Sequence, residues 1–89
     1  MPRTIWKFTL APADEQTIDM PHGARLITAR EQRDEVCVWA EVNPAAPMQR
    51  RTFRVAGTGH PLPDRPMIYV GTAMPHGGDP VFHVYELVA

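Results

Sequence analysis

Glu35-Val-Cys-Val-Trp-Ala-Glu-Val42 is the stretch of sequence that decides the fold. Its residues alternate between two faces, with Val36, Val38, Ala40 and Val42 on one and Cys37, Trp39 and Glu41 on the other. An alternation of period two is the mark of a β-strand, and β-branched side chains pack well on a pleated surface. Residues 35–42 are therefore expected to form a strand.

The chain before this stretch predicts three further strands. Residues 4–10 place Trp6, Phe8 and Leu10 on one face, and residues 16–20 place Ile18 and Met20 inward. Residues 24–33 carry enough charge for a helix, but their apolar residues do not recur at helical spacing. We therefore expect a strand here, followed by a hairpin turn near Arg33-Asp34, with a helix as the alternative.

The chain after residue 42 continues in short strands separated by breakers. Residues 49–56, 67–72 and 81–87 are the expected strands, and proline-rich loops occupy 43–47, 57–66 and 75–80. In residues 49–56, Arg51, Phe53 and Val55 oppose Arg50, Thr52 and Arg54. The second of these faces is expected to be solvated, and its charge could protect the edge of a sheet.

These patterns predict one domain over residues 1–89, of the all-β or mainly β class. About seven short strands at roughly twelve-residue spacing are typical of a small antiparallel sandwich or a partly open barrel. Consecutive strands are expected to pair as antiparallel hairpins, because no connection is long enough for a crossover helix. A sheet of this size could leave an edge or an apolar face uncovered, so a homo-oligomer stays an open alternative.

Composition excludes several classes of protein. The 89 residues carry a formal net charge of −1, which argues against a nucleic-acid partner. A single cysteine, Cys37, permits no internal disulfide and favours a reducing compartment. No apolar run approaches the ~20 residues of a membrane span, so we expect no membrane partner and a cytoplasmic location.

The side chains that could carry chemistry have ordinary structural explanations. His22, His60, His76 and His83 lack metal-ligand spacing, so neither a metal nor another cofactor is expected. Cys37 lies between two valines and is expected to be a small core or interface hydrophobe rather than a nucleophile. The carboxylates Asp14-Glu15 and Asp34-Glu35 fall in or beside turns, and nothing points to paired acid–base catalysis. No catalytic residue is predicted.

The best candidate for a recognition surface is the stretch around Gly57-Thr-Gly-His60. Closely spaced glycines can expose backbone amides to an anion, although this spacing matches neither a phosphate-binding loop nor a dinucleotide fingerprint. Binding residues concentrate on loops held by rigid scaffolds. We therefore predict a binding surface made of Gly57, Gly59 and His60, with Arg54 supplying charge.

Several blocks of the sequence resemble a family of short hypothetical proteins of tailed bacteriophages and prophages, including those of actinobacteria. The blocks are Arg3–Phe8, Asp14–Pro21 with Gly23-Ala24, Cys37–Pro44, Phe53–Pro61, Tyr69–Thr72 and Phe82–Val84. They cover nearly the whole chain in the same order. The Arg33-Asp34-Glu35 turn departs from the Asn-Gly type of the relatives, which leaves the type of hairpin open.

The resemblance implies a setting and no catalytic residues. It suggests a phage-encoded accessory protein that is present inside the infected cell. We expect a non-enzymatic protein that binds a host or phage macromolecule, most readily a protein. The alternatives are a small-molecule binder that recognises a nucleotide signal or counters a defence system, and a minor component of the virion.

Overall fold

The computed structural model describes residues 2–88 and contains seven strands and one short 3₁₀ helix. The strands are β1 (Thr4–Thr9), β2 (Glu15–Pro21), β3 (Arg25–Gln32), β4 (Glu35–Val42), β5 (Met48–Gly57), β6 (Met67–Ala73) and β7 (Phe82–Leu87), and η1 spans Pro75–Gly77. Every strand predicted from the alternation is confirmed. The ambiguous residues 24–33 form β3, because their apolar residues follow a period of two.

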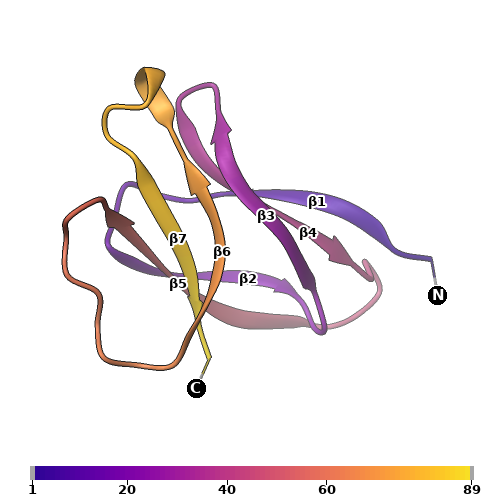
Figure 1. The fold of residues 1–89 in the computed structure, drawn as a ribbon. Coiled ribbons are helices and arrows are strands. Elements are labelled where there is room, and N and C mark those ends of the chain that lie inside the picture. The colour runs from indigo at the N-terminus through magenta and orange to yellow at the C-terminus, as the bar shows by residue number, and fades with distance from the viewer. Residues whose placement is uncertain (1, 89) are drawn as a thin grey trace.

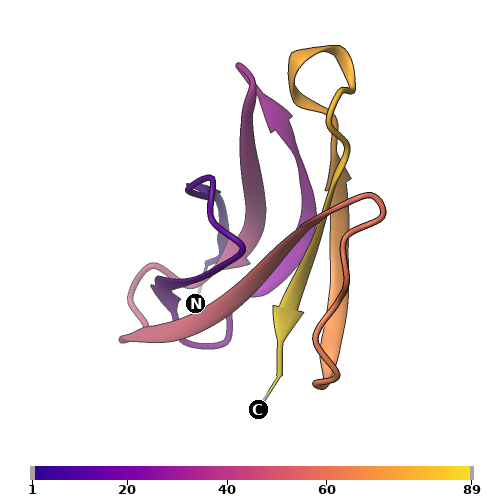
Figure 2. The same cartoon turned by 90° about the vertical axis from the view of Figure 1, so that its left-hand side faces the viewer.

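The strands form two antiparallel sheets, one with the order β1-β4-β3 and one with the order β2-β5-β7-β6 (Figures 1 and 2). The predicted all-β fold is confirmed as two packed sheets that do not close into a barrel. Of the consecutive strands, only β3–β4 and β6–β7 pair as hairpins. The expectation that all consecutive strands would pair is wrong, because the chain crosses between the sheets after β1, β2 and β4 and follows a long loop after β5.

The core lies between the inner faces of the two sheets. Val38, Ala40 and Val42 of β4 are fully buried there, and Phe53 of β5 and Val84 of β7 meet them from the other sheet. The predicted inward set on β2 is also confirmed, with Met20 fully buried and Ile18 packed against the core. Since each sheet contributes one apolar face, neither sheet would be stable alone.

The sheets approach each other most closely where β6 passes β3 (Figure 1). A Cβ atom added to Gly71 would lie 2.5 Å from both the amide nitrogen and the carbonyl oxygen of Ala29. No side chain fits at that distance from a backbone. Gly71 is therefore required by the contact between the two sheets.

The β3–β4 hairpin turns at Arg33 and Asp34, as the sequence predicts. Both residues adopt a positive φ, 52° and 63° respectively. Positive φ at both central residues is the geometry of a type I′ turn, which normally selects Asn-Gly. The twist of the two strands thus imposes a left-handed conformation on Arg33, which disfavours it, and on Asp34, which tolerates it.

Strand direction collects four connections at one end of the molecule. Strands β1, β3, β5 and β6 all finish there, so residues 10–14, the β3–β4 turn, residues 57–60 and residues 74–81 lie together at the upper left of Figure 1. We call this the loop end. The opposite end, where β2, β4 and β7 finish and β1 begins, is called the terminal end.

Candidate functional site

The loop end is hollowed by a cleft of about 460 Å³. Leu10, Val36, Val55 and Phe82 are among the apolar residues that line it, and they are contributed by both sheets. The rim carries Asp14, Asp34, Glu35, His60 and His76. Ligand pockets commonly measure about 300–1,000 Å³ and combine apolar walls with a few polar groups. In size and composition, the cleft therefore resembles a ligand site.

The rim is held by hydrogen bonds between loops that are far apart in sequence. The His76 amide donates to Asp34 Oδ1 at 2.9 Å, and His76 Nδ1 lies 3.6 Å from Asp34 Oδ2. The Met74 amide donates to Glu31 Oε1 at 2.5 Å. On the other side, the Val55 amide donates to the Asp14 carbonyl at 2.8 Å. The cleft is thus built before any ligand arrives.

The predicted recognition residues are divided by the fold. Gly57 and His60 line the cleft, and the imidazole of His60 lies so close over Gly57 that an added Cβ would be 3.1 Å from the ring. The His60 amide donates to the Gly57 carbonyl at 3.0 Å, which closes a tight turn. Gly59 adopts a φ of +89° in that turn and points into open space. These three residues form one loop, and two of them face the cleft.

Arg54 does not join the other three predicted residues. It pairs in register with Tyr85 on the outer face of the four-stranded sheet, whereas Gly57 belongs to the inner face. Its guanidinium lies 4.0 Å from Glu15, which is also 3.0 Å from Arg65. Arg54 therefore cannot supply charge to a ligand in the cleft.

The solvated face predicted for Arg50, Thr52 and Arg54 is confirmed for Arg50 but not for Arg54, whose side chain is only 23% exposed. Strand β5 lies between β2 and β7, so it is not the edge that the sequence suggested. Arg50 is exposed, but Arg51 points inward and is mostly buried. Because β5 has a partner on both sides, only the outer face of the strand can be solvated.

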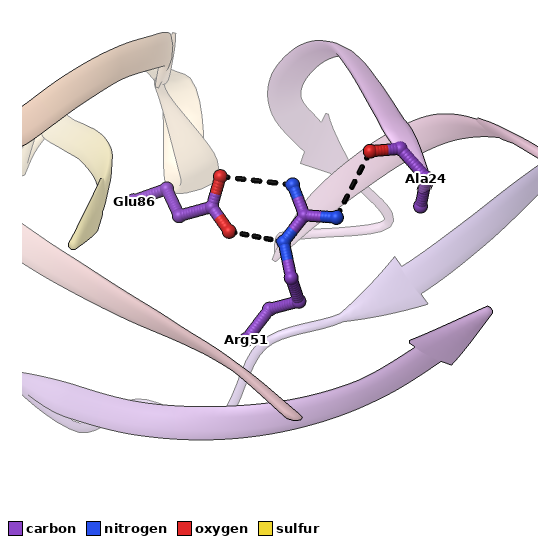
Figure 3. A network of polar contacts seen from close by, with 3 residues as sticks. All are labelled: Ala24, Arg51 and Glu86. Atoms are coloured by element: carbon purple, nitrogen blue, oxygen red, sulfur yellow. Dashed lines mark hydrogen bonds and ion pairs between the residues drawn. The ribbon is translucent and has the colours of Figure 1, made fainter. Parts of the chain in front are cut away.

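A buried polar network ties β5 and β7 of the four-stranded sheet to the β2–β3 connection near the terminal end (Figure 3). Arg51 Nη2 donates to Glu86 Oε1 at 2.9 Å, and Arg51 Nε donates to the other carboxylate oxygen. Arg51 Nη1 donates to the carbonyl of Ala24 at 2.9 Å. The hydrogen bond to Glu86 raises the pKa of Arg51, against an opposing effect of burial. Since an arginine side chain is already charged over the ordinary pH range, the raised pKa keeps the guanidinium charged beside Glu86.

Of the other chemical candidates, Cys37 has the buried position that the sequence predicts. Cys37 is fully buried, with its sulfur 3.8 Å from the hydroxyl of Thr9. His83 is held on the outer sheet face between the hydroxyls of Thr58, at 2.8 Å, and Thr72, at 3.3 Å. Across residues 2–88, no group of three or more His, Cys, Asp or Glu side chains is placed to hold a metal ion.

Sequence reasoning missed the rim residues Asp14, Asp34, Glu35 and His76 as a group. Each was identified only as an ordinary turn residue. The available signal was strand direction, because connections that follow alternate strands of an antiparallel fold lie at the same end. To apply this rule, one must also know that the loop after β5 runs from the loop end back to the terminal end. Strand β6 then points in the same direction as β5 and finishes at the loop end as well.

Together, the fold and the cleft define a small all-β domain with a cleft between the ends of its two sheets. The chain belongs to a family described as a domain of unknown function, DUF7352, whose model matches residues 1–89. No curated protein and no solved structure matches the chain. Within the described residues, no helix is long and apolar enough to cross a membrane.

Proposed function

We propose that this chain is a non-enzymatic binding domain that holds a segment of a protein partner in the cleft at the loop end. The observation that carries this proposal is the cleft itself, which is mainly apolar, preformed and open at the surface. We further propose, from the resemblance to phage proteins, that the domain is phage-encoded and acts on a host or phage protein in the cytoplasm of the infected cell.

The cleft gives less support to a nucleotide signal as the ligand. Phosphate recognition usually relies on Arg, Lys or a cluster of backbone amides. None of the residues that line the cleft is Arg or Lys, and Arg54 lies on the opposite face of the sheet. The acids at the rim would also repel a phosphate. The protein partner is therefore the better-supported proposal.

Matched tryptophan substitutions test the proposal. Ala13 and Ala45 are both exposed alanines in loops, but Ala13 lines the cleft and Ala45 lies at the terminal end. Ala13→Trp should block the cleft, while Ala45→Trp should leave it open. Tagged wild-type protein and both variants would be expressed in infected host cells and used to capture partners under mild conditions.

We expect a specific protein to be recovered with the wild type and with Ala45→Trp and to be lost, by at least tenfold, with Ala13→Trp. Both variants should retain the wild-type circular dichroism spectrum, since the two alanines are exposed. Recovery of the same partner at equal yield with Ala13→Trp would contradict the proposal. Repeated recovery of no partner with the wild type would also count against it.

A further inference from the structure

The charge of the cleft allows the class of its occupant to be specified. Three carboxylates, those of Asp14, Asp34 and Glu35, lie among the lining residues, and no Arg or Lys lies among them. Asp34 is engaged by His76 through the amide and the ring. The side chains of Asp14 and Glu35 have no ion-pair or hydrogen-bond partner among residues 2–88.

Five of the seven other carboxylates have a partner, Glu31 at the Met74 amide among them, whereas the exposed Asp64 and Asp79 have none among residues 2–88. Glu15, Asp19, Glu41 and Glu86 each lie within 4.0 Å of an arginine side chain. Asp14 and Glu35 are thus unneutralised acids beside an apolar surface, although the chain as a whole is close to neutral. An unpaired charge next to a low-dielectric wall attracts an opposite charge more strongly than one in open water.

Resting on the proposed function, we infer that the occupant of the cleft is a protein segment with an apolar side chain flanked by lysine or arginine. The apolar side chain lies against Leu10, Val55 and Phe82. The flanking cation reaches Asp14 or Glu35 at the rim. A segment with acidic flanks is rejected, because its charge would lie beside the same two carboxylates.

Three short peptides of one design serve as probes. Each has a central leucine in the same Gly-Ser frame, with blocked ends and flanks of Lys-Leu-Lys, Ser-Leu-Ser or Glu-Leu-Glu. Binding to the full chain is followed by two-dimensional NMR titration in low salt, which reports both affinity and location. We expect the Lys-flanked peptide to bind at least tenfold more tightly than the Glu-flanked one, with shifts at residues of the loop end.

A charge-matched pair of double variants locates the effect. Asp14→Asn/Glu35→Gln removes the two rim acids, and Asp19→Asn/Glu41→Gln removes two acids outside the cleft with the same change in net charge. The first variant should reduce the Lys-over-Glu preference to about threefold or less, and the second should preserve it. In 0.5 M salt the wild-type preference should also shrink, because the rim charges are screened.

Three results would overturn the inference. The first is equal binding of the Lys- and Glu-flanked peptides, and the second is the absence of shifts at the loop end with all three peptides at millimolar concentration. The third is a dimer that dissociates in the Asp14→Asn/Glu35→Gln variant, which would make a second copy of the chain the occupant. A partner lost with Ala13→Trp but indifferent to the rim acids would contradict this inference alone and leave the proposed function standing.

Discussion

The two ends of the molecule treat their charged groups in opposite ways. Near the terminal end, Arg51 and Glu86 are mostly buried and face each other through two hydrogen bonds, and Arg51 also donates to the carbonyl of Ala24 in the β2–β3 connection. At the loop end, Asp14 and Glu35 stand at the rim of an open cleft without such partners. The difference separates charged groups that contribute to the stability of the fold from charged groups that stand free at the surface, where the proposal places a ligand.

The largest expected effect comes from removing one member of the buried Arg51–Glu86 pair, which tests whether this pair stabilises the fold. Glu86→Ala should lower the free energy of unfolding by about 3–5 kcal/mol, because it leaves the guanidinium of Arg51 buried and uncompensated. Urea denaturation followed by tryptophan fluorescence measures the change.

Two further variants serve as controls for this prediction. Arg50→Ala should cost less than about 1 kcal/mol, because Arg50 and Asp19 form an exposed pair at 4.0 Å. Arg51→Met/Glu86→Leu should recover most of the lost stability, since an apolar pair leaves no charge unpaired. A loss below about 1 kcal/mol in Glu86→Ala would mean that the network contributes little to the stability of the fold.

The next largest loss of stability is expected where the two sheets touch, at Gly71 of β6 and Ala29 of β3. Gly71→Ala should destabilise the protein by about 1–3 kcal/mol or more, because its Cβ would collide with the backbone of Ala29. Gly57→Ala is the matched control, since its Cβ would meet only the ring of His60, a side chain that can move aside, at 3.1 Å. Thermal denaturation of both variants should rank Gly71→Ala well below Gly57→Ala, and the reverse order would contradict the assignment.

A smaller effect, of opposite sign, is expected at the β3–β4 turn. Arg33 adopts a φ of 52°, and a non-glycine residue in this region costs roughly 1–2 kcal/mol. Asparagine tolerates the conformation better, so Arg33→Asn should stabilise the protein by about 0.5–1 kcal/mol. Asp34 is left in place because it accepts a hydrogen bond from His76. Chemical denaturation would reveal the gain, and destabilisation would show that Arg33 has a role beyond the turn.

The smallest change in stability is predicted for the two rim acids, Asp14 and Glu35. This prediction tests directly whether the charged groups at the two ends differ in their contribution to the fold. Asp14→Asn/Glu35→Gln should change the free energy of unfolding by no more than about 0.5 kcal/mol, because surface groups without partners contribute little. The same urea titration as for Glu86→Ala measures this. A loss greater than about 1 kcal/mol would assign these carboxylates to the fold and remove the contrast between the two ends.

Much of the local structure could be predicted from sequence, because it follows from alternation and from turn chemistry. The seven strands, the inward position of Met20 and the turn at Arg33-Asp34 all depend on neighbours within a few residues. The pairing of strands could not be predicted in the same way. Alternation indicates which face of a strand is buried, but it does not identify the strand beside it.

The candidate site was predicted in part for the same reason. Gly57 and His60 were identified from their local spacing, and the structure brings both to the cleft. Arg54 was grouped with them by proximity in sequence, but three residues along a strand reverse the face, so it lies on the other side of the sheet. The partners at the rim, such as Asp34 and His76, are 42 residues apart in sequence.

The sequence by itself determined that this protein is a small all-β domain, because period-two patterning and proline-rich breakers act over short distances. Only the tertiary structure decided that Arg51 is a buried link to Glu86, 35 residues away, and that the turns at 10–14, 33–34, 57–60 and 74–81 enclose one cleft. Whether a charged side chain is buried, and which group it pairs with, depends on which strands and loops come into contact. That is decided by the packing of the two sheets, which no short stretch of sequence encodes.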